Sequence, residues 1–259
     1  FCDIVEERAQ SRAKEFGATK VYTDYRSLIA ESGVDVISIC SSNETHAEVA
    51  IAAAEAGIHV LCEKPMAQSL KECDDMIAAA AKSSVVLACN FQSRFFPRTH
   101  WLKAQIEAGR LGDAVIAKGY GWTIHVWDLV PYIMGPPVRV SAEWGGEQQM
   151  YRDPLLATVR FEEGSATLPD GSGQALPSKH IGFMQASRFH EPQLPDRHNG
   201  FHFVGSKLTA SFGLWANQLV LTSDDADYAA EMERLKAEAF GNQPLLAPSV
   251  PDVTDFLRA

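Results

Sequence analysis

Apolar and polar positions in the first part of the chain form two alternating kinds of segment. Short apolar runs without polar alternation are typical of buried parallel strands. They cover Val21–Tyr22, Val34–Cys40, Ile58–Cys62 and Val85–Cys89. Between them lie longer segments of helical spacing and composition: Ile4–Phe16 closed by Gly17, an alanine-rich run over 47–56 closed by Gly57, and Lys71–Lys82. This order of elements predicts a doubly wound parallel sheet.

The pattern changes after Phe95, where strand-like runs follow one another with few helices between them. A helix is predicted over Thr99–Gly109 and an amphipathic one over Ala226–Phe240, and Pro251–Leu257 resembles the start of another. The predicted strands are Gly112–Gly119, Val138–Trp144, Leu155–Phe161, Phe183–Phe189 and Gly200–Phe212. Pro169–Gln174 has loop composition. The chain is therefore expected to hold two domains.

Composition narrows the possible functions. With 259 residues the chain is long enough for two domains, and its net charge of −10 argues against nucleic acid or an anionic membrane as a partner. It has no apolar run of about 18 residues that could span a bilayer. Five cysteines without metal-type spacing indicate packing residues in a reducing compartment, so we expect a cytoplasmic protein without a metal site.

Polar residues follow two of the predicted strands at their carboxyl ends, where open α/β sheets bind ligands. Glu63-Lys64-Pro65 ends one strand, and Ser41-Ser42-Asn43 forms the turn after another. A lysine beside a carboxylate can position a reacting hydroxyl or move its proton, although a surface ion pair would explain the same residues. Asp3 ends a first strand, where a carboxylate can accept hydrogen bonds from ribose hydroxyls, but a helix N-cap is an equal interpretation.

A second candidate centre lies in Thr123–Asp128. A helix would place His125 and Asp128, at i and i+3, on one face, which suits a histidine base with a carboxylate partner. The alternative is a capping or core histidine.

Several of these motifs together resemble the Gfo/Idh/MocA family of NAD(P)-dependent oxidoreductases. The resemblance rests on Asp3, SSNETHAEVA, AGIHVLCEKPMA, NFQSRFFP and IHVWDLVPYIMG, and it runs in unbroken order over about the first 140 residues. The E-K-P tripeptide after a strand is its most specific part. In Thr123–Asp128 the chain departs from the family pattern, because Gly121 occupies the place of an aspartate four residues before the histidine.

The resemblance implies a Rossmann-type dinucleotide-binding domain over residues 1–94 and, over 95–259, an α/β domain with a large, open, mostly antiparallel sheet. It implies that the second domain binds substrate and pairs subunits through its sheet, giving a homodimer or homotetramer. Lys64 and His125 would be catalytic. Cofactor contacts would come from Asp3, Ser41, Ser42, Asn43, His46, Glu63, Lys64 and Gln92, and substrate contacts from Arg94, Trp122 and Asp128. The cofactor would be NAD, with NADP possible because Arg8 and Arg12 lie near Asp3.

The expected activity is hydride transfer between NAD(P) and a secondary hydroxyl of a cyclic polyol, sugar or sugar derivative. Two alternatives remain open within the same family: an NAD-dependent glycosidase that oxidises C3 transiently, and a catalytically silent sugar or cofactor sensor. No glycine-rich turn precedes Asp3, and the Trp122-Thr123 join is abrupt. We therefore expect that segments of a longer natural chain are missing from this sequence.

Overall fold

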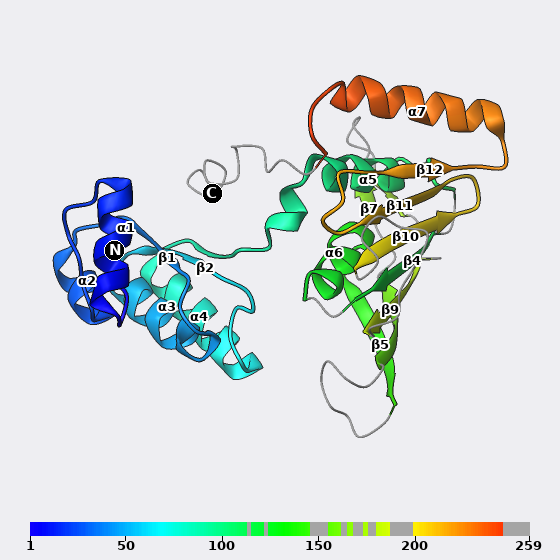
Figure 1. Cartoon of the computed structure of the whole chain (residues 1–259). Coiled ribbons are helices and arrows are strands. Elements are labelled where there is room, and N and C mark those ends of the chain that lie inside the picture. Colours follow the sequence, from blue (N-terminus) through cyan, green and yellow to red (C-terminus); the bar gives the residue numbers. More distant parts are fainter. Residues whose placement is uncertain are drawn as a thin grey trace. The chain divides into compact units, whose positions relative to one another are not determined.

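A computed structural model describes residues 1–112, 115–121, 124–145, 155–161, 165–167, 173–175, 180–186 and 199–245. Residues 1–91 form one compact unit, and a second unit begins at Gln92 (Figure 1). This division falls slightly before the domain boundary expected after Arg94. Among the described residues, no helix combines the length and the apolar character needed to cross a membrane.

The first unit is built on a small parallel sheet with the strand order β1-β2-β3. Its elements are α1 (Glu6–Phe16), α2 (Tyr25–Glu31), β1 (Val36–Ile39), the 3-10 turn η1 (Asn43–Thr45), α3 (His46–Glu55), β2 (His59–Cys62), α4 (Leu70–Ser83) and β3 (Leu87–Cys89). Cys2 and Tyr22 pair in parallel as an isolated bridge, in place of the two short strands expected there.

Local sequence explains where several of these helices begin and end. Asp24 accepts a hydrogen bond from the amide of Ser27 at the start of α2, and Ser69 accepts one from that of Glu72 in α4. Gly17 ends α1 in the left-handed conformation, as the sequence predicts. The alanine-rich α3 ends one residue earlier than predicted, with Ala56 as its cap, and Gly57 takes the positive φ of 79°. Small side chains on α3 let it pack closely on the sheet, and Ala50, Ala53 and Val60 lie in this core.

The second unit carries a seven-stranded sheet with the order β12-β11-β10-β4-β9-β6-β5. Its strands are β4 (Val115–Tyr120), β5 (Pro137–Trp144), β6 (Leu155–Phe161), β9 (Ile181–Ala186), β10 (Gly200–Gly205), β11 (Thr209–Gly213) and β12 (Val220–Thr222). All pairs are antiparallel except β4 with β9. This confirms the predicted fold class, a parallel Rossmann-type sheet followed by a large, mostly antiparallel one.

The remaining elements of this unit are η2 (Gln92–Phe95), α5 (Pro97–Glu107), α6 (Ile124–Met134), α7 (Ala226–Phe240) and a small hairpin of β7 (Ser165–Thr167) and β8 (Gly173–Ala175). The loop predicted over Pro169–Gln174 is therefore wrong at its end, because backbone pairing draws Gly173 and Gln174 into β8. The strand predicted over Phe183–Phe189 begins earlier, at Ile181. The expected helix over Pro251–Leu257 lies outside the described residues.

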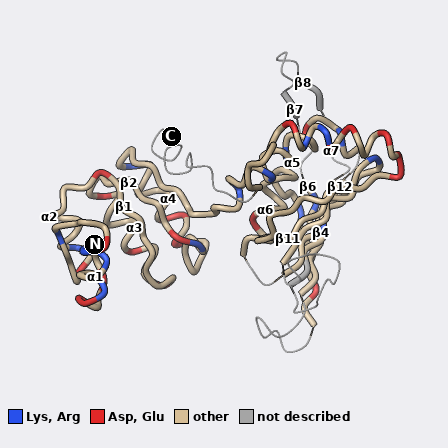
Figure 2. Tube along the Cα trace, turned by 45° about the horizontal axis from the view of Figure 1, so that its top comes forward, with Lys and Arg blue, Asp and Glu red and all other residues tan. Residues whose placement is uncertain are grey.

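Helices α5 and α6 lie over one face of the large sheet, and α7 runs along β12 (Figure 1). Figure 2 shows acidic and basic residues following one another along α7, as expected of a solvated helix face. The close approach of α6 to the sheet depends on Gly119, because a Cβ at that position would lie 2.8 Å from Val126 Cγ1. Gly182 serves the same purpose, since its Cβ would lie 3.2 Å from Val130 Cγ1. These two glycines set the position of the helix that carries His125.

Candidate active site

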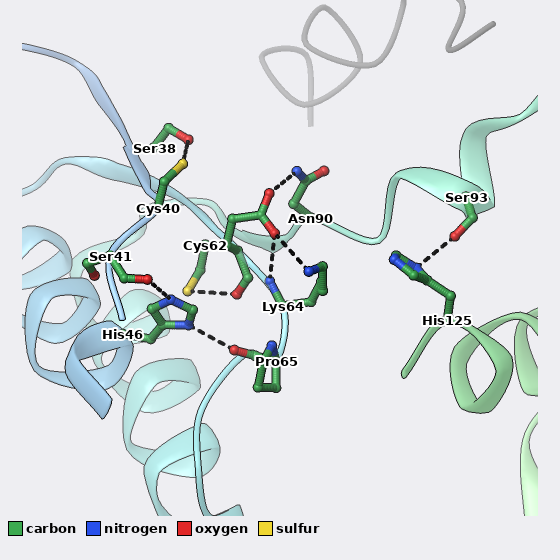
Figure 3. A network of polar contacts seen from close by, with 11 residues as sticks. Ser38, Cys40, Ser41, His46, Cys62, Lys64, Pro65, Asn90, Ser93 and His125 are labelled. Atoms are coloured by element: carbon green, nitrogen blue, oxygen red, sulfur yellow. Dashed lines mark hydrogen bonds and ion pairs between the residues drawn. The ribbon is translucent and has the colours of Figure 1, made fainter. Parts of the chain in front are cut away.

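Three polar segments lie together at the carboxyl edge of the first unit's sheet (Figure 3). The backbone pairing continues past the strands, because the amide of Glu63 donates to Ile39 O at 2.9 Å and that of Asn90 to Cys62 O at 2.7 Å. The Ser41 turn, the Glu63-Lys64-Pro65 loop and Asn90 therefore share one edge, as parallel strands require.

Glu63 is the centre of this polar network. Its carboxylate accepts hydrogen bonds from Asn90 Nδ2 at 2.6 Å and from the Lys64 amide at 3.2 Å, and Lys64 Nζ lies 3.9 Å from Oε2. The Glu63 and Lys64 side chains keep about a third of their surface exposed, at 31% and 35%. Held in place and still accessible, the carboxylate can accept from a bound hydroxyl and the ammonium can donate to one.

A buried thiol hydrogen-bonds the backbone of the loop that carries Lys64. Cys62 Sγ donates to Glu63 O at 3.4 Å and lies 3.7 Å from Met66 O. Burial, with a smaller contribution from neighbouring Cys89, raises the pKa of Cys62 to about 12. The thiol therefore stays protonated, and acts as a hydrogen-bond donor rather than as a nucleophile.

His46 joins the turn after β1 to the loop after β2. Its ring is fully buried, with Nδ1 2.8 Å from Pro65 O and Nε2 3.2 Å from Ser41 O. Sequence analysis expected His46 to line the cofactor. The structure buries the ring, and both ring nitrogens face backbone carbonyls of the same unit (Figure 3).

Of the other expected cofactor residues of this unit, Ser41, Ser42 and Asn43 are exposed and Asp3 is partly buried. Ser41, Ser42 and Asn43 occupy the turn before α3, and the Ser41 hydroxyl lies 2.7 Å from Thr45 Oγ1. Asp3 accepts a hydrogen bond from the amide of Val5 at 2.8 Å, so one carboxylate oxygen already bonds the backbone just before α1. These hydroxyl, amide and carboxylate groups form a donor and acceptor set suited to the ribose hydroxyls of a dinucleotide, and the residues present fit NAD.

In the second unit, His125 is held by a neighbouring hydroxyl. It lies near the start of α6, is 3% exposed, and its Nδ1 is 2.9 Å from Ser93 Oγ. Ser93 is in turn fixed from its backbone, because Thr99 Oγ1 donates to Ser93 O at 2.9 Å. This network orients the imidazole from the Nδ1 side.

Asp128, expected to orient His125, is engaged by Arg94 instead. Arg94 Nε donates to both carboxylate oxygens, at 2.9 and 3.0 Å, and Nη2 donates to Oδ1 as well. The Arg94 guanidinium also lies 5.1 Å from the centroid of the Tyr132 ring. A buried carboxylate is most stable with a planar, bidentate partner, and η2 brings Arg94 to it. Asp128 is 8% exposed, whereas the Arg94 side chain is 40% exposed and can reach a ligand.

Other expectations have simple outcomes. Gln92 begins η2 and is partly buried, and Trp122 lies outside the described residues. His180 accepts a hydrogen bond from the amide of Val115 and His202 bonds Ser211, so both serve the sheet. Within the described part of the chain, no three His, Cys, Asp or Glu side chains are grouped to hold a metal ion.

Two polar partners were not singled out by sequence reasoning. Asn90 follows β3 as Glu63 follows β2, so the rule that ligands bind at strand ends could have found it. Ser93 could not have been found from the sequence, because it is far from His125 along the chain and no helix or strand spacing relates the two residues.

The structure defines a nucleotide-binding α/β unit joined to a second unit that carries a histidine with a fixed ring. Residues 1–91 match the family model described as "Oxidoreductase family, NAD-binding Rossmann fold". With this match the first unit is a Gfo/Idh/MocA-type NAD-binding domain, and the resemblance drawn from the sequence is confirmed. NAD is accordingly the cofactor class of the first unit.

Curated relatives carry related names. Myo-inositol 2-dehydrogenase of Thermotoga maritima is 31% identical over 67% of this chain and 60% of its own length. Inositol 2-dehydrogenase of Salmonella paratyphi B is 37% identical over 63% of this chain and 55% of its own. D-glucoside 3-dehydrogenase of Escherichia coli is 28% identical over 63% of this chain and 59% of its own. The chain thus spans about 55–60% of the length of these relatives.

A solved structure supports the fold. Levoglucosan dehydrogenase in complex with NADH and levoglucosan superposes with a TM-score of 0.67 at 24% identity, covering 87% of this chain and 67% of that protein. At this level of identity the likeness concerns the fold.

Proposed function

We propose that the whole protein is an NAD-dependent dehydrogenase that oxidises a secondary hydroxyl of a cyclic polyol, sugar or sugar derivative. The observation that carries the proposal is the Glu63-Lys64-Asn90 network at the carboxyl edge of an NAD-binding Rossmann unit. The substrate class is supported by the inositol and glucoside dehydrogenases among the relatives.

In this proposal Lys64 and His125 handle the hydroxyl proton. The Lys64 ammonium donates to the substrate oxygen and stabilises the negative charge that develops on it, while Glu63 keeps the ammonium in place. His125 Nδ1 lies 2.9 Å from Ser93 Oγ, which orients the ring, and the imidazole acts as the base that accepts the proton. NAD, when bound, supplies the hydride acceptor. Arg94, fixed by Asp128, binds a substrate hydroxyl.

Cofactor preference follows from Asp3. A carboxylate at this strand end accepts from both adenosine ribose hydroxyls but repels a 2′-phosphate, so we propose NAD over NADP. Arg8 lies 3.7 Å from Asp3 and is the group that could weaken this preference.

We also propose a homodimer or homotetramer that pairs through the large sheet. The sheet face opposite α6 carries exposed apolar side chains, among them Ile116 on β4, Leu156 on β6, Val204 on β10 and Val220 on β12. A face of this kind is more typical of a subunit interface than of a solvated surface.

A substrate panel tests the proposed activity. The purified protein is incubated with NAD or NADP and with inositols, aldoses and methyl glycosides, while absorbance of the reduced cofactor and release of free sugar are both followed. NADH accumulation with at least one cyclic substrate is expected. Sugar release without net NADH would make the protein a glycosidase, and ligand binding without turnover would make it a sensor.

A further inference from the structure

The loop between β11 and β12 is held by an arginine buried inside the second unit. Arg98, in α5, is 0% exposed, and its guanidinium donates to the carbonyls of Leu214 and Ala216 and, at 3.4 Å, to that of Gln218. The same guanidinium lies 4.5 Å from the centroid of the Phe212 ring. Burying a charged side chain costs free energy unless its donors find acceptors, so these carbonyls and Arg98 fix one another.

Further bonds hold the rest of this loop. The amide of Leu214 donates to Asn199 O at 2.9 Å, and Lys236 Nζ donates to Leu219 O at 3.0 Å. The loop is therefore pinned along its backbone at both ends, and the side chain of Trp215 between them has a defined position.

Trp215 is the exposed aromatic residue of this pinned loop and lies directly beside His125. Their ring centroids are 5.4 Å apart and the rings are nearly perpendicular, at 86°. Phe96 also packs against Trp215 in an edge-to-face arrangement, with ring centroids 6.2 Å apart. Even so, 48% of Trp215 stays exposed. A rigid indole that is half open to solvent costs little entropy when it binds a ligand, and its face suits the C–H groups of a sugar ring.

We infer that Trp215 is a specificity-determining residue, an aromatic wall against which the apolar face of a cyclic polyol or pyranose stacks beside His125, and that Arg98 is its positioning residue. The inference rests on the proposed function and deepens it. It explains why the protein would prefer cyclic over acyclic polyols, because a ring with axial C–H groups offers a flat apolar face and an acyclic polyol does not.

The test compares Trp215→Leu and Trp215→Phe with Trp144→Leu. Trp144 is a matched control because it is also a partly exposed tryptophan, at 37%, but belongs to the edge strand β5. With the best cyclic substrate of the panel, Trp215→Leu should raise KM on the order of tenfold and leave the NAD dissociation constant unchanged, since stacking on an aromatic ring is lost. Trp215→Phe should recover most of the affinity. For xylitol, an acyclic polyol, KM should change by less than about twofold.

Arg98→Lys tests the positioning role. A lysine keeps the charge but cannot span several carbonyls with a planar fork, so KM for the cyclic substrate should rise in the same direction as in Trp215→Leu. The wall is refuted if Trp215→Leu lowers kcat and shifts the pH profile while KM stays constant, because the tryptophan would then only support His125.

Calorimetric titration of the sugars separates this inference from the proposed activity. If the wild-type protein binds a cyclic sugar without oxidising it and Trp215→Leu loses that binding, the wall stands and the dehydrogenase proposal fails. If turnover is found and KM is unchanged in Trp215→Leu, the wall fails and the dehydrogenase proposal stands. If no sugar binds or reacts, both fail.

Discussion

Replacing His46 should loosen the edge of the first unit without touching an exposed catalytic group. His46→Leu keeps a side chain of similar volume in a fully buried position and removes both ring nitrogens. It therefore removes the one ring N–H, which is donated to Pro65 O or to Ser41 O according to the tautomer, and with it the connection between the loop of Lys64 and the turn after β1.

The size of the effect follows from the single N–H that a neutral imidazole can donate. One net hydrogen bond contributes about 0.5–1.5 kcal/mol, so the free energy of unfolding should fall by about 1 kcal/mol. For a unit of about 90 residues this lowers the midpoint of thermal unfolding by about 4–8 °C. His46→Gln keeps an amide donor and should lose less.

Scanning calorimetry measures the change. The relevant transition is the one that NAD moves to higher temperature, because a ligand stabilises the unit that binds it. His100→Leu is the control, since His100 is exposed on α5 and should shift its midpoint little. A His46→Leu midpoint within about 2 °C of the wild type would refute this account of His46, as would an unchanged NAD affinity.

The remaining predictions concern the proposed reaction and assembly. Lys64→Met should lower kcat on the order of a hundredfold with NAD affinity nearly intact, and near-normal turnover would leave Lys64 a structural role. Oxidation should decline as pH falls and His125 takes up a proton, and His125→Asn should remove that limb and slow oxidation on the order of a hundredfold; a profile unchanged by the mutation would assign the base elsewhere. The wild-type kcat/KM should be higher with NAD than with NADP, and Asp3→Asn should reduce this ratio. Equal kcat/KM with the two cofactors in the wild type would contradict the role proposed for Asp3. In sedimentation velocity Ile116→Glu combined with Val204→Lys should give monomers, and oligomers that survive both changes would place the interface elsewhere.

The sequence by itself determined the fold class and the larger elements. The end of the first helix followed from Gly17, whose effect is local, and strand runs such as the one ending at Cys62 were apolar enough to be recognised alone. The Glu63-Lys64 pair was found because the end of a parallel strand is a position that the sequence defines.

Only the tertiary structure decided the partners of the polar side chains. Spacing on a helix paired Asp128 with His125, but η2 delivers Arg94 to Asp128 and Ser93 to His125. The burial of His46 and the placement of Trp215 beside His125 depend in the same way on segments distant along the chain. Hydrogen bonds and ring contacts form between the groups that packing brings within a few ångströms of each other. The order of those groups along the chain does not predict which of them will meet.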